Sequence, residues 1–317
     1  MSKVKLSLAI GNHDLTQALT QGQIGVEGVE LLVSTIHDAN DRNQRLMNME
    51  FDAGEFSMCS HIVAHAKGYP FTAIPVFPHR RFPHSNFIVN INSGINSPAD
   101  LKGKRIGVNS LQTMWTLWSG GILEEHYGIP FEDLRWFAHG RNVVDSAVPK
   151  GVSLSALSTG KSLDAALLDG DVDMVTGPQI QPSIRNGSPK VKRLFPDFKA
   201  EEMQYYSKTG IFPVMHVMII KRSILEGHLW IARNLLDAFD KAKQACYGLM
   251  EGSWFLNLVW YRALLEEERK FFGKDIWAYD LKDNETNIAT MIRYARRQGM
   301  IDKEMAVNDL FVESVGN

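Results

Sequence analysis

Residues 73–90 read Ala73-Ile-Pro-Val-Phe-Pro-His-Arg-Arg-Phe-Pro-His-Ser-Asn-Phe-Ile-Val-Asn90, a short apolar run that breaks at Pro78 and resumes at Phe87. Between the two runs stand two arginines, two histidines and a serine. Arginine can hold a planar carboxylate through two hydrogen bonds, and histidine can move a proton near neutral pH. Such polar groups are typical of a site rather than of a core. The stretch therefore predicts a binding site for an organic acid.

On both sides of this stretch, strand-like and helix-like segments alternate. Apolar, β-branched segments with polar or Gly/Pro boundaries predict strands at residues 4–10, 29–35, 71–77, 84–90, 105–108, 134–137, 172–176 and 216–221. Helical patterns lie between them at residues 39–49, 60–67, 112–127, 162–169 and 224–250. This alternation predicts an α/β protein with largely parallel sheets.

The length of 317 residues predicts two domains, because a single domain typically has roughly 100 to 200 residues. After residue 221 the sequence is helical almost throughout, so these helices need a sheet formed earlier in the chain. We expect a discontinuous first domain of residues 1–87 and 217–317, and an inserted α/β domain of residues 88–216. The chain then crosses between the domains near Phe87 and near His216, and the two antiparallel crossings form a hinge.

Composition excludes several classes of partner. A formal net charge of −2 argues against nucleic acid and against a membrane surface, since both need a clustered basic surface. No window approaches the roughly 18 apolar residues that span a bilayer, and the start lacks the apolar centre of a secretion signal. Cys59 and Cys246 indicate neither a disulfide framework nor a metal site. These features favour a cytoplasmic protein, and an aromatic segment at 254–261 fits either a homo-oligomer contact or a buried helix.

Two segments of the expected second domain resemble a known fold. The segment Ser97-Pro-Ala-Asp-Leu-Lys-Gly-Lys-Arg-Ile-Gly-Val108 resembles the start of the second domain in type II periplasmic-binding folds. Residues 163–175, Leu-Asp-Ala-Ala-Leu-Leu-Asp-Gly-Asp-Val-Asp-Met-Val, resemble the helix, Gly-Asp turn and strand that follow there. Gly170 suits this turn because glycine can adopt the left-handed conformation that ends a helix. The resemblance implies a ligand site in the crevice between the domains.

Blocks along nearly the whole chain resemble the 4,5-dihydroxyphthalate decarboxylase family, and they occur in family order. The blocks are 8–11 with Asp14, 29–35, 51–57, 73–78, Arg80, Phe82, His84, Ser85, 193–197, 205–206 and 209–216. The resemblance implies a cytoplasmic carboxy-lyase that converts 4,5-dihydroxyphthalate to protocatechuate and CO2. The chain departs from the family pattern at His79 and Pro83, where serine and arginine often stand. These departures leave a related aromatic acid open as the substrate.

His84 and His216 would each begin one of the two crossing strands, so we expect them to meet at the crevice. One would deliver a proton to the ring carbon that bears the leaving carboxylate, and the other would contact a phenol oxygen. Asp14 follows the first strand and could orient a histidine or accept a bond from a hydroxyl group. The structural alternatives are histidines that cap strand ends and an aspartate that caps a helix.

Other residues are candidates for substrate binding. Arg80 is the first candidate for the carboxylate, with a structural salt bridge as the alternative. Arg81 would join it only if the break at Pro78 twists the chain, because neighbouring residues of a strand face opposite ways. His79 and Ser85 complete the set from this stretch. Glu55 and Ser57, in an expected loop before a helix that begins near residue 60, are further candidates.

Asn109-Ser-Leu-Gln-Thr-Met-Trp115 lies between an expected strand and an expected helix. Free amides and the positive end of that helix could hold a carboxylate, which makes Ser110, Gln112 and Thr113 candidate contacts. The alternative is helix capping by Asn109 or Ser110, and one geometry can serve both needs.

The motifs predict no cofactor, and they leave open whether the protein requires a divalent metal. An oxygen and nitrogen site for a metal that chelates catechol oxygens could draw on His13, Asp14, His79, His84 and His216, but no closely spaced metal signature is present. A non-catalytic solute-binding protein for a small organic acid is the alternative to an enzyme, because the same fold can close on a ligand in both cases.

Overall fold

The computed structural model describes residues 3–252 and 256–313. Its first sheet has five strands in the order β2-β1-β3-β11-β4. The strands are β1 (Val4–Ile10), β2 (Val29–Thr35), β3 (Ala53–Ser57), β4 (Phe71–Ile74) and β11 (His216–Lys221). β1 runs parallel to β2 and β3, whereas β11 runs antiparallel to both β3 and β4. The carboxyl ends of β1 and β3 and the amino end of β11 therefore meet at one edge of the sheet.

The second sheet has six strands in the order β10-β5-β9-β6-β7-β8. They are β5 (Ile88–Asn90), β6 (Arg105–Val108), β7 (Arg135–Ala138), β8 (Ser153–Ala156), β9 (Met174–Val175) and β10 (Val191–Arg193). β6 to β9 form parallel pairs, and β5 pairs antiparallel with β9 and β10. The polar loop after β6 opens toward the first sheet.

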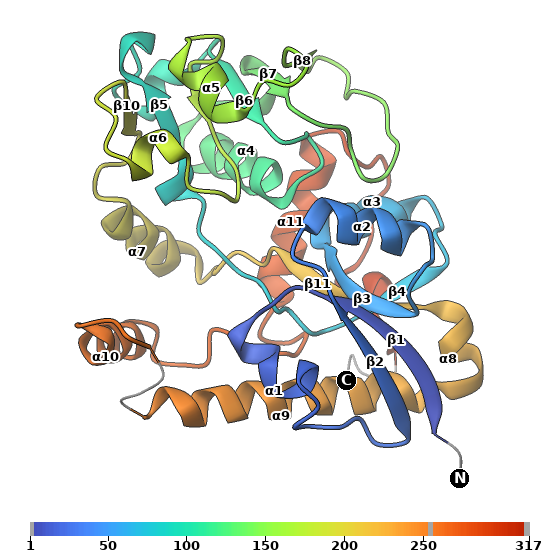
Figure 1. Ribbon diagram of the computed structural model, residues 1–317. Helices are drawn as coiled ribbons and strands as arrows, with labels where there is room; N and C mark the ends of the chain where they lie inside the picture. Colours follow the sequence, from blue (N-terminus) through green and yellow to red (C-terminus); the bar gives the residue numbers. More distant parts are fainter. Residues whose placement is uncertain (1–2, 253–255, 314–317) are drawn as a thin grey trace.

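Helices cover both sheets (Figure 1). The first sheet is accompanied by α1 (Gln17–Thr20), α2 (Ala39–Met47), α3 (Met58–Ala66), α8 (Arg222–His228) and α9 (Trp230–Met250). The second sheet is accompanied by α4 (Met114–Tyr127), α5 (Leu163–Leu168), α6 (Pro182–Arg185) and α7 (Phe198–Thr209). The chain ends with α10 (Tyr261–Phe272) and α11 (Glu285–Arg297). α9 is amphipathic, since its buried Ile231, Leu235 and Phe239 recur at four-residue spacing.

Two segments carry the chain between the sheets, one after β4 and one before β11 (Figure 1). They run antiparallel beside each other and are tied by an Arg80–Val214 bridge. The backbone N–H of Met215 donates to the His79 carbonyl at 2.9 Å, and that of Arg81 donates to Pro213 at 3.1 Å. The expected pair of crossings is therefore present, and it brings residue 79 beside residue 216.

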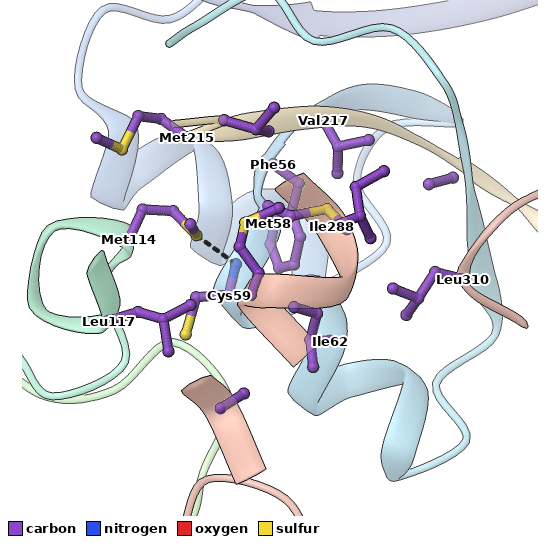
Figure 2. Packing of buried hydrophobic residues seen from close by; sticks show 14 of the residues in the cluster. Phe56, Met58, Cys59, Ile62, Met114, Leu117, Met215, Val217, Ile288 and Leu310 are labelled. Carbon is purple, nitrogen blue, oxygen red and sulfur yellow. Dashed lines mark hydrogen bonds between the residues drawn. The ribbon is translucent and has the colours of Figure 1, made fainter. Parts of the chain in front are cut away.

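A hydrophobic cluster extends from the first sheet and its helices to the helices of the second sheet. It includes Cys59 and Ile62 of α3, Leu117 of α4, Val217 of β11 and Ile288 of α11 (Figure 2). α11 completes the link, because the Tyr294 hydroxyl donates to Glu125 at 2.6 Å and the Gln298 amide donates to the Leu117 carbonyl at 2.9 Å. The two sheets therefore share a core as well as the crossings.

Several predicted elements agree with the structure at their full bounds, namely the strands at 4–10, 29–35, 105–108 and 216–221. The predicted strand at 84–90 is wrong in its first half. Residues His84–Asn86 form a 3-10 turn in which the Asn86 N–H donates to the Pro83 carbonyl at 2.9 Å, and the strand begins at Ile88. The predicted helix at 224–250 is interrupted at Leu229. Residues 53–57 form a strand rather than the expected loop.

Part of the aromatic segment at 254–261 lies outside the described residues, which exclude 253–255. In the described remainder, Val259 is 90% exposed and Trp260 is 73% exposed. A buried helix at these positions is therefore wrong, and a homo-oligomer contact stays a prediction. No helix within 3–252 and 256–313 is long and apolar enough to cross a membrane. The domain limits at residues 87 and 217 likewise stay a prediction.

Candidate active site

A cavity of about 550 Å³ lies where the loops of the two sheets meet. The first sheet contributes the residues that follow β1, the amino end of α2, the end of β3 and the start of β11. The second sheet contributes the loop from β6 into α4, and the crossing contributes His79. A volume of this size is typical of a small-molecule site.

Glu55 is the centre of the polar network in this cavity. Its side chain is fully buried. One carboxylate oxygen accepts from the Gly11 N–H at 2.7 Å and contacts His13 Nε2 at 3.0 Å. The other oxygen contacts Arg42 Nη2 at 3.0 Å and pairs with His216 Nδ1. Every partner is held by the carboxyl end of β1, by α2 or by β11, so the network depends on the fold of the first sheet.

Arg42 is itself fixed in place. Its Nε donates to the Glu55 carbonyl at 3.0 Å, and its Nη1 donates to the Ile36 carbonyl at 2.7 Å. Burial alone would raise the pKa of Glu55, but the hydrogen bonds from His216 and His13 and the Arg42 guanidinium together hold it well below its usual range. The carboxylate is therefore ionised, and Arg42 compensates its charge.

Burial lowers the pKa of His216, although the Glu55 carboxylate opposes that shift. Because Arg42 already compensates the carboxylate, we assign His216 as neutral. Its Nδ1–H donates to Glu55, which leaves Nε2 with a free lone pair. A histidine held in this way can accept a proton, and the resulting imidazolium is stabilised by the carboxylate behind it.

His79 stands between two other imidazoles. Its ring centroid is 4.9 Å from that of His216 and 5.8 Å from that of His13, with which it stacks. Burial lowers the pKa of His79 well below its ordinary value, and His216 and Arg81 add to the shift. Its Nδ1 is buried without a hydrogen-bond partner in the described part of the chain. His13, His79 and His216 thus gather around the Glu55 carboxylate on the wall of one cavity, which His37 and Asp38 also line.

Polar residues at the start of two helices complete the wall. Ser57 caps α3, and its Oγ accepts from the Ser60 N–H at 3.4 Å. Thr113 caps α4, and its Oγ1 accepts from the Thr116 N–H at 3.1 Å. The helix expected after the loop is present, and Thr113 caps it, so the alternative of capping by Asn109 or Ser110 is wrong.

Sequence comparison gives the family of the chain. A 4,5-dihydroxyphthalate decarboxylase of Comamonas testosteroni is 31% identical over 98% of this chain and 97% of its own length. A Pseudomonas putida protein of the same name is 30% identical over 65% of this chain and 83% of its own length. The chain belongs to the 4,5-dihydroxyphthalate decarboxylase family. Residues 11–135 also match the family described as NMT1/THI5 like.

Solved structures show the fold of this family member. The alkanesulfonate-binding protein SsuA of Xanthomonas axonopodis pv. citri, bound to MOPS, has a TM-score of 0.53 at 14% identity, covering 98% of this chain and 99% of its own. The ligand-binding component of an ABC-type import system of Staphylococcus aureus has a TM-score of 0.57 at 12% identity, with 99% and 98% covered. The desulfurization enzyme DszB has a TM-score of 0.51 at 14% identity, with 98% and 96% covered. The predicted periplasmic-binding-type α/β fold is confirmed.

Seven of the predicted site residues of this family member line the cavity. They are Glu55, Ser57, His79, Ser110, Gln112, Thr113 and His216. Gln112 has no free polar group for a ligand, because its amide donates to the Val144 carbonyl at 3.1 Å and accepts from the Val144 N–H at 2.8 Å. It holds the loop that closes one side of the cavity.

The expected meeting of His84 with His216 is wrong. His84 is 1% exposed, lies outside the cavity lining, and packs among the rings of Phe87, Phe195 and Tyr205. Burial lowers the pKa of His84 to about 4. His84 is displaced from the cavity because the 3-10 turn after Pro83 directs its side chain into the core beside the second sheet.

Arg80 is also directed away from the cavity. Its guanidinium donates to the carbonyls of Phe212 at 3.3 Å and Ala278 at 3.2 Å, and to Asn284 Oδ1 at 2.5 Å. It lies 5.3 Å from the centre of the Phe77 ring. Burial lowers its pKa to about 10. Arg80 therefore ties the first crossing to the C-terminal part of the chain, and it does so through neutral acceptors rather than through the salt bridge that was the alternative to carboxylate binding.

Three further candidates lie outside the cavity lining. Arg81 donates to the Arg80 carbonyl at 3.0 Å and lines a separate cavity of about 390 Å³ beside α7 and α10. Ser85 donates from its backbone N–H to Glu202 at 3.3 Å. Asp14 accepts from the Leu15 N–H at 2.8 Å at the start of a 3-10 turn. Each is engaged by its own neighbours.

Arg42 and Ser60 line the cavity but were not predicted from the sequence. A signal for Arg42 was available, because it shares a helix face with Leu46, four residues on, and both are buried. Ser60 gave no signal, since one serine at the start of a helix is common. No group of three or more His, Cys, Asp or Glu among the described residues is placed to hold a metal ion.

Proposed function

We propose that this protein catalyses the non-oxidative decarboxylation of a hydroxylated aromatic dicarboxylate, with 4,5-dihydroxyphthalate giving protocatechuate and CO2 as the leading reaction. The observation that supports this most directly is the pairing of His216 with the buried Glu55, beside His79, in the cavity between the sheets. Family membership supports the same reaction class.

In 4,5-dihydroxyphthalate each carboxylate lies para to a phenol oxygen, so the hard step is protonation of the ring carbon that bears the carboxylate. We assign His216 Nε2 as the base that takes the proton of the para hydroxyl. The imidazolium that forms is stabilised by Glu55, which Arg42 keeps ionised and oriented. A positioned acid or base of this kind contributes about 100-fold to 10,000-fold to the rate.

We assign His79 as the acid that delivers a proton to the ring carbon, in the proton-donor role that the sequence left open between His84 and His216. Burial keeps His79 neutral in the unliganded protein, and a bound substrate dianion favours its protonated form. The dienone that results loses CO2: the carbon–carbon bond breaks, and its electron pair restores the aromatic ring and the phenolate. The imidazolium of His216 returns its proton to the phenolate oxygen. One proton is consumed at His79 in each turnover and is replaced from solvent. His13, whose side chain is 21% exposed, stacks on His79 on the side toward solvent access.

A solute-binding protein without catalytic activity is the alternative, and the shared fold with SsuA favours it. The buried Glu55–Arg42 pair counts against it, because binding an organic anion gains nothing from a carboxylate behind the site. Because the chain has His79 where the family often has serine, a related aromatic acid is an alternative substrate.

The test is to incubate purified, chelator-treated protein with 4,5-dihydroxyphthalate and to follow CO2 and protocatechuate, with and without added divalent metal. We expect stoichiometric release of both products. Binding is measured in parallel by the change in tryptophan fluorescence, to which Trp115 in the cavity wall contributes. Tight binding without product under both metal conditions would support the solute-binding alternative and overturn the proposed reaction.

A further inference from the structure

Two residues that line the cavity each have a polar side-chain atom that is buried without a hydrogen-bond partner in the described part of the chain, namely His79 Nδ1 and Ser60 Oγ. His79 belongs to the histidine group described above. Ser60 lies near the start of α3, is fully buried, and takes no part in the proposed proton transfers. An unpartnered buried hydroxyl destabilises the unliganded protein, so its position needs an explanation. A ligand group that bonds to it would supply one.

The first turn of α4 forms the neighbouring wall. α4 has 14 residues, and the first backbone N–H groups of a helix have no partner within the helix. No hydrogen bond within 3–252 and 256–313 engages the N–H groups of Met114 and Trp115, although both residues line the cavity. These amides and the positive end of the helix favour a negatively charged ligand.

The starts of α3 and α4 are in direct contact. The Cys59 N–H donates to Met114 Sδ at 2.8 Å, as the dashed line in Figure 2 shows. Ser60 follows Cys59 in α3, and Ser60, Met114 and Trp115 all line the same cavity. The amino end of α2 also reaches this cavity, but the carboxylate of Asp38 already accepts from the Asn40 and Asp41 N–H groups there. α4 is therefore the helix end with amides left for an anion.

We infer that the Ser60 hydroxyl and the first-turn amides of α4 form a subsite for a second carboxylate, the one that the product retains. This inference rests on the proposed function for the role of that carboxylate. Ser57 is the β3 partner of His216, and the Ser60 N–H donates to Ser57 Oγ, so the subsite adjoins the histidine pair. It selects an aromatic ring with two neighbouring carboxylates over a ring with one.

The test measures binding of phthalate, a dianion without hydroxyl groups, and of benzoate, its monoanion counterpart, to the full chain. Ser60→Ala removes one hydrogen bond to a charged group, so we expect phthalate binding to weaken by about 10-fold to 100-fold. Benzoate binding should change less than threefold, and the free energy of unfolding should stay equal or rise. Ser119→Ala is the matched control, because Ser119 is buried in α4, bonds to Thr176 at 3.0 Å and lies outside the cavity lining.

Two results would overturn the subsite: unchanged phthalate affinity in Ser60→Ala, or an equal loss for phthalate and benzoate. The outcome is separable from that of the proposed function. If the protein releases no CO2 but Ser60→Ala still weakens phthalate selectively, the subsite stands and the reaction is wrong. If CO2 is released and Ser60→Ala changes neither phthalate binding nor KM, the reaction stands and the subsite is wrong.

Discussion

His79 and His84 lie five residues apart in one crossing segment, and both have a pKa lowered by burial. Their neighbours differ. His79 faces the cavity between the rings of His13 and His216, whereas His84 packs among aromatic rings in the second unit. A lowered pKa therefore does not mark a catalytic histidine by itself. The presence of other titratable groups around a common cavity distinguishes the two.

The two buried arginines show the same contrast. Arg80 is bound by two backbone carbonyls and an asparagine, so its charge faces the protein. Arg42 is equally buried, but it pairs with Glu55 and thereby sets the charge of the carboxylate behind His216. Arg80 therefore has a structural role, whereas Arg42 positions a candidate catalytic group. The difference lies in the partner that each guanidinium binds.

The largest expected effect is at the histidine that the carboxylate orients. His216→Asn removes the proposed base but keeps a polar side chain, so we expect kcat to fall by about 1,000-fold, within the usual range for general acid–base catalysis. The dissociation constant for 4,5-dihydroxyphthalate should change less than fivefold, because the carboxylate subsite is intact. Single-turnover kinetics with a parallel binding titration measures both quantities. A kcat within tenfold of the wild-type value would remove His216 from the mechanism.

The next largest expected effect comes from comparing the same substitution at His79 and at His84. We expect His79→Asn to lower kcat by about 100-fold, since it removes the proposed acid. His84→Asn should leave kcat within threefold, and should instead lower the free energy of unfolding by about 1–3 kcal/mol because it disrupts an aromatic cluster. Steady-state assays and urea unfolding of both variants separate the roles. A larger loss of kcat in His84→Asn than in His79→Asn would reverse the comparison.

The fold was largely predictable because it depends on long, regular patterns. β1, β2, β6 and β11 have the predicted bounds, since each is a short apolar or β-branched run between polar residues. β3, β8 and β10 were missed. β8 (Ser153–Ala156) is mostly exposed and carries serines, so it lacks the apolar signal on which such a prediction depends. Pairing with β7 maintains it as a strand despite its sequence.

The site was predictable only where regular elements deliver its residues. His216 begins β11 opposite Ser57 of β3, and Glu55 lies two positions before Ser57 on the same face of that strand, so topology brings Glu55 and His216 together. The crossing segment has no regular hydrophobic pattern from which side-chain directions could be predicted. The 3-10 turn after Pro83 determines which of its side chains face the cavity. Residue types alone made Arg80 and His84 as plausible as His79. The contacts made by each side chain were needed to separate them.

The smallest expected effect concerns stability rather than rate. The pKa of His84 is about 4 in the folded protein and near 6.5 in an unfolded chain, so only the unfolded state gains a proton as the pH falls below 6.5. Its contribution to stability is fully present above pH 6.5 and is lost toward pH 4. Between pH 6.5 and 5.5 this one group accounts for a loss of about 1 kcal/mol.

His84→Asn removes that titration, so the free energy of unfolding of this variant should fall by about 1 kcal/mol less than that of the wild type over this interval. Urea unfolding at pH 7.5, 6.5 and 5.5 measures it. Other buried histidines, including His61, whose pKa burial lowers to about 4, keep their own titrations in both proteins and cancel in the difference. An identical pH dependence in the two proteins would mean that His84 is already accessible to protons in the folded state. The contrast with His79 would then rest on their different neighbours alone.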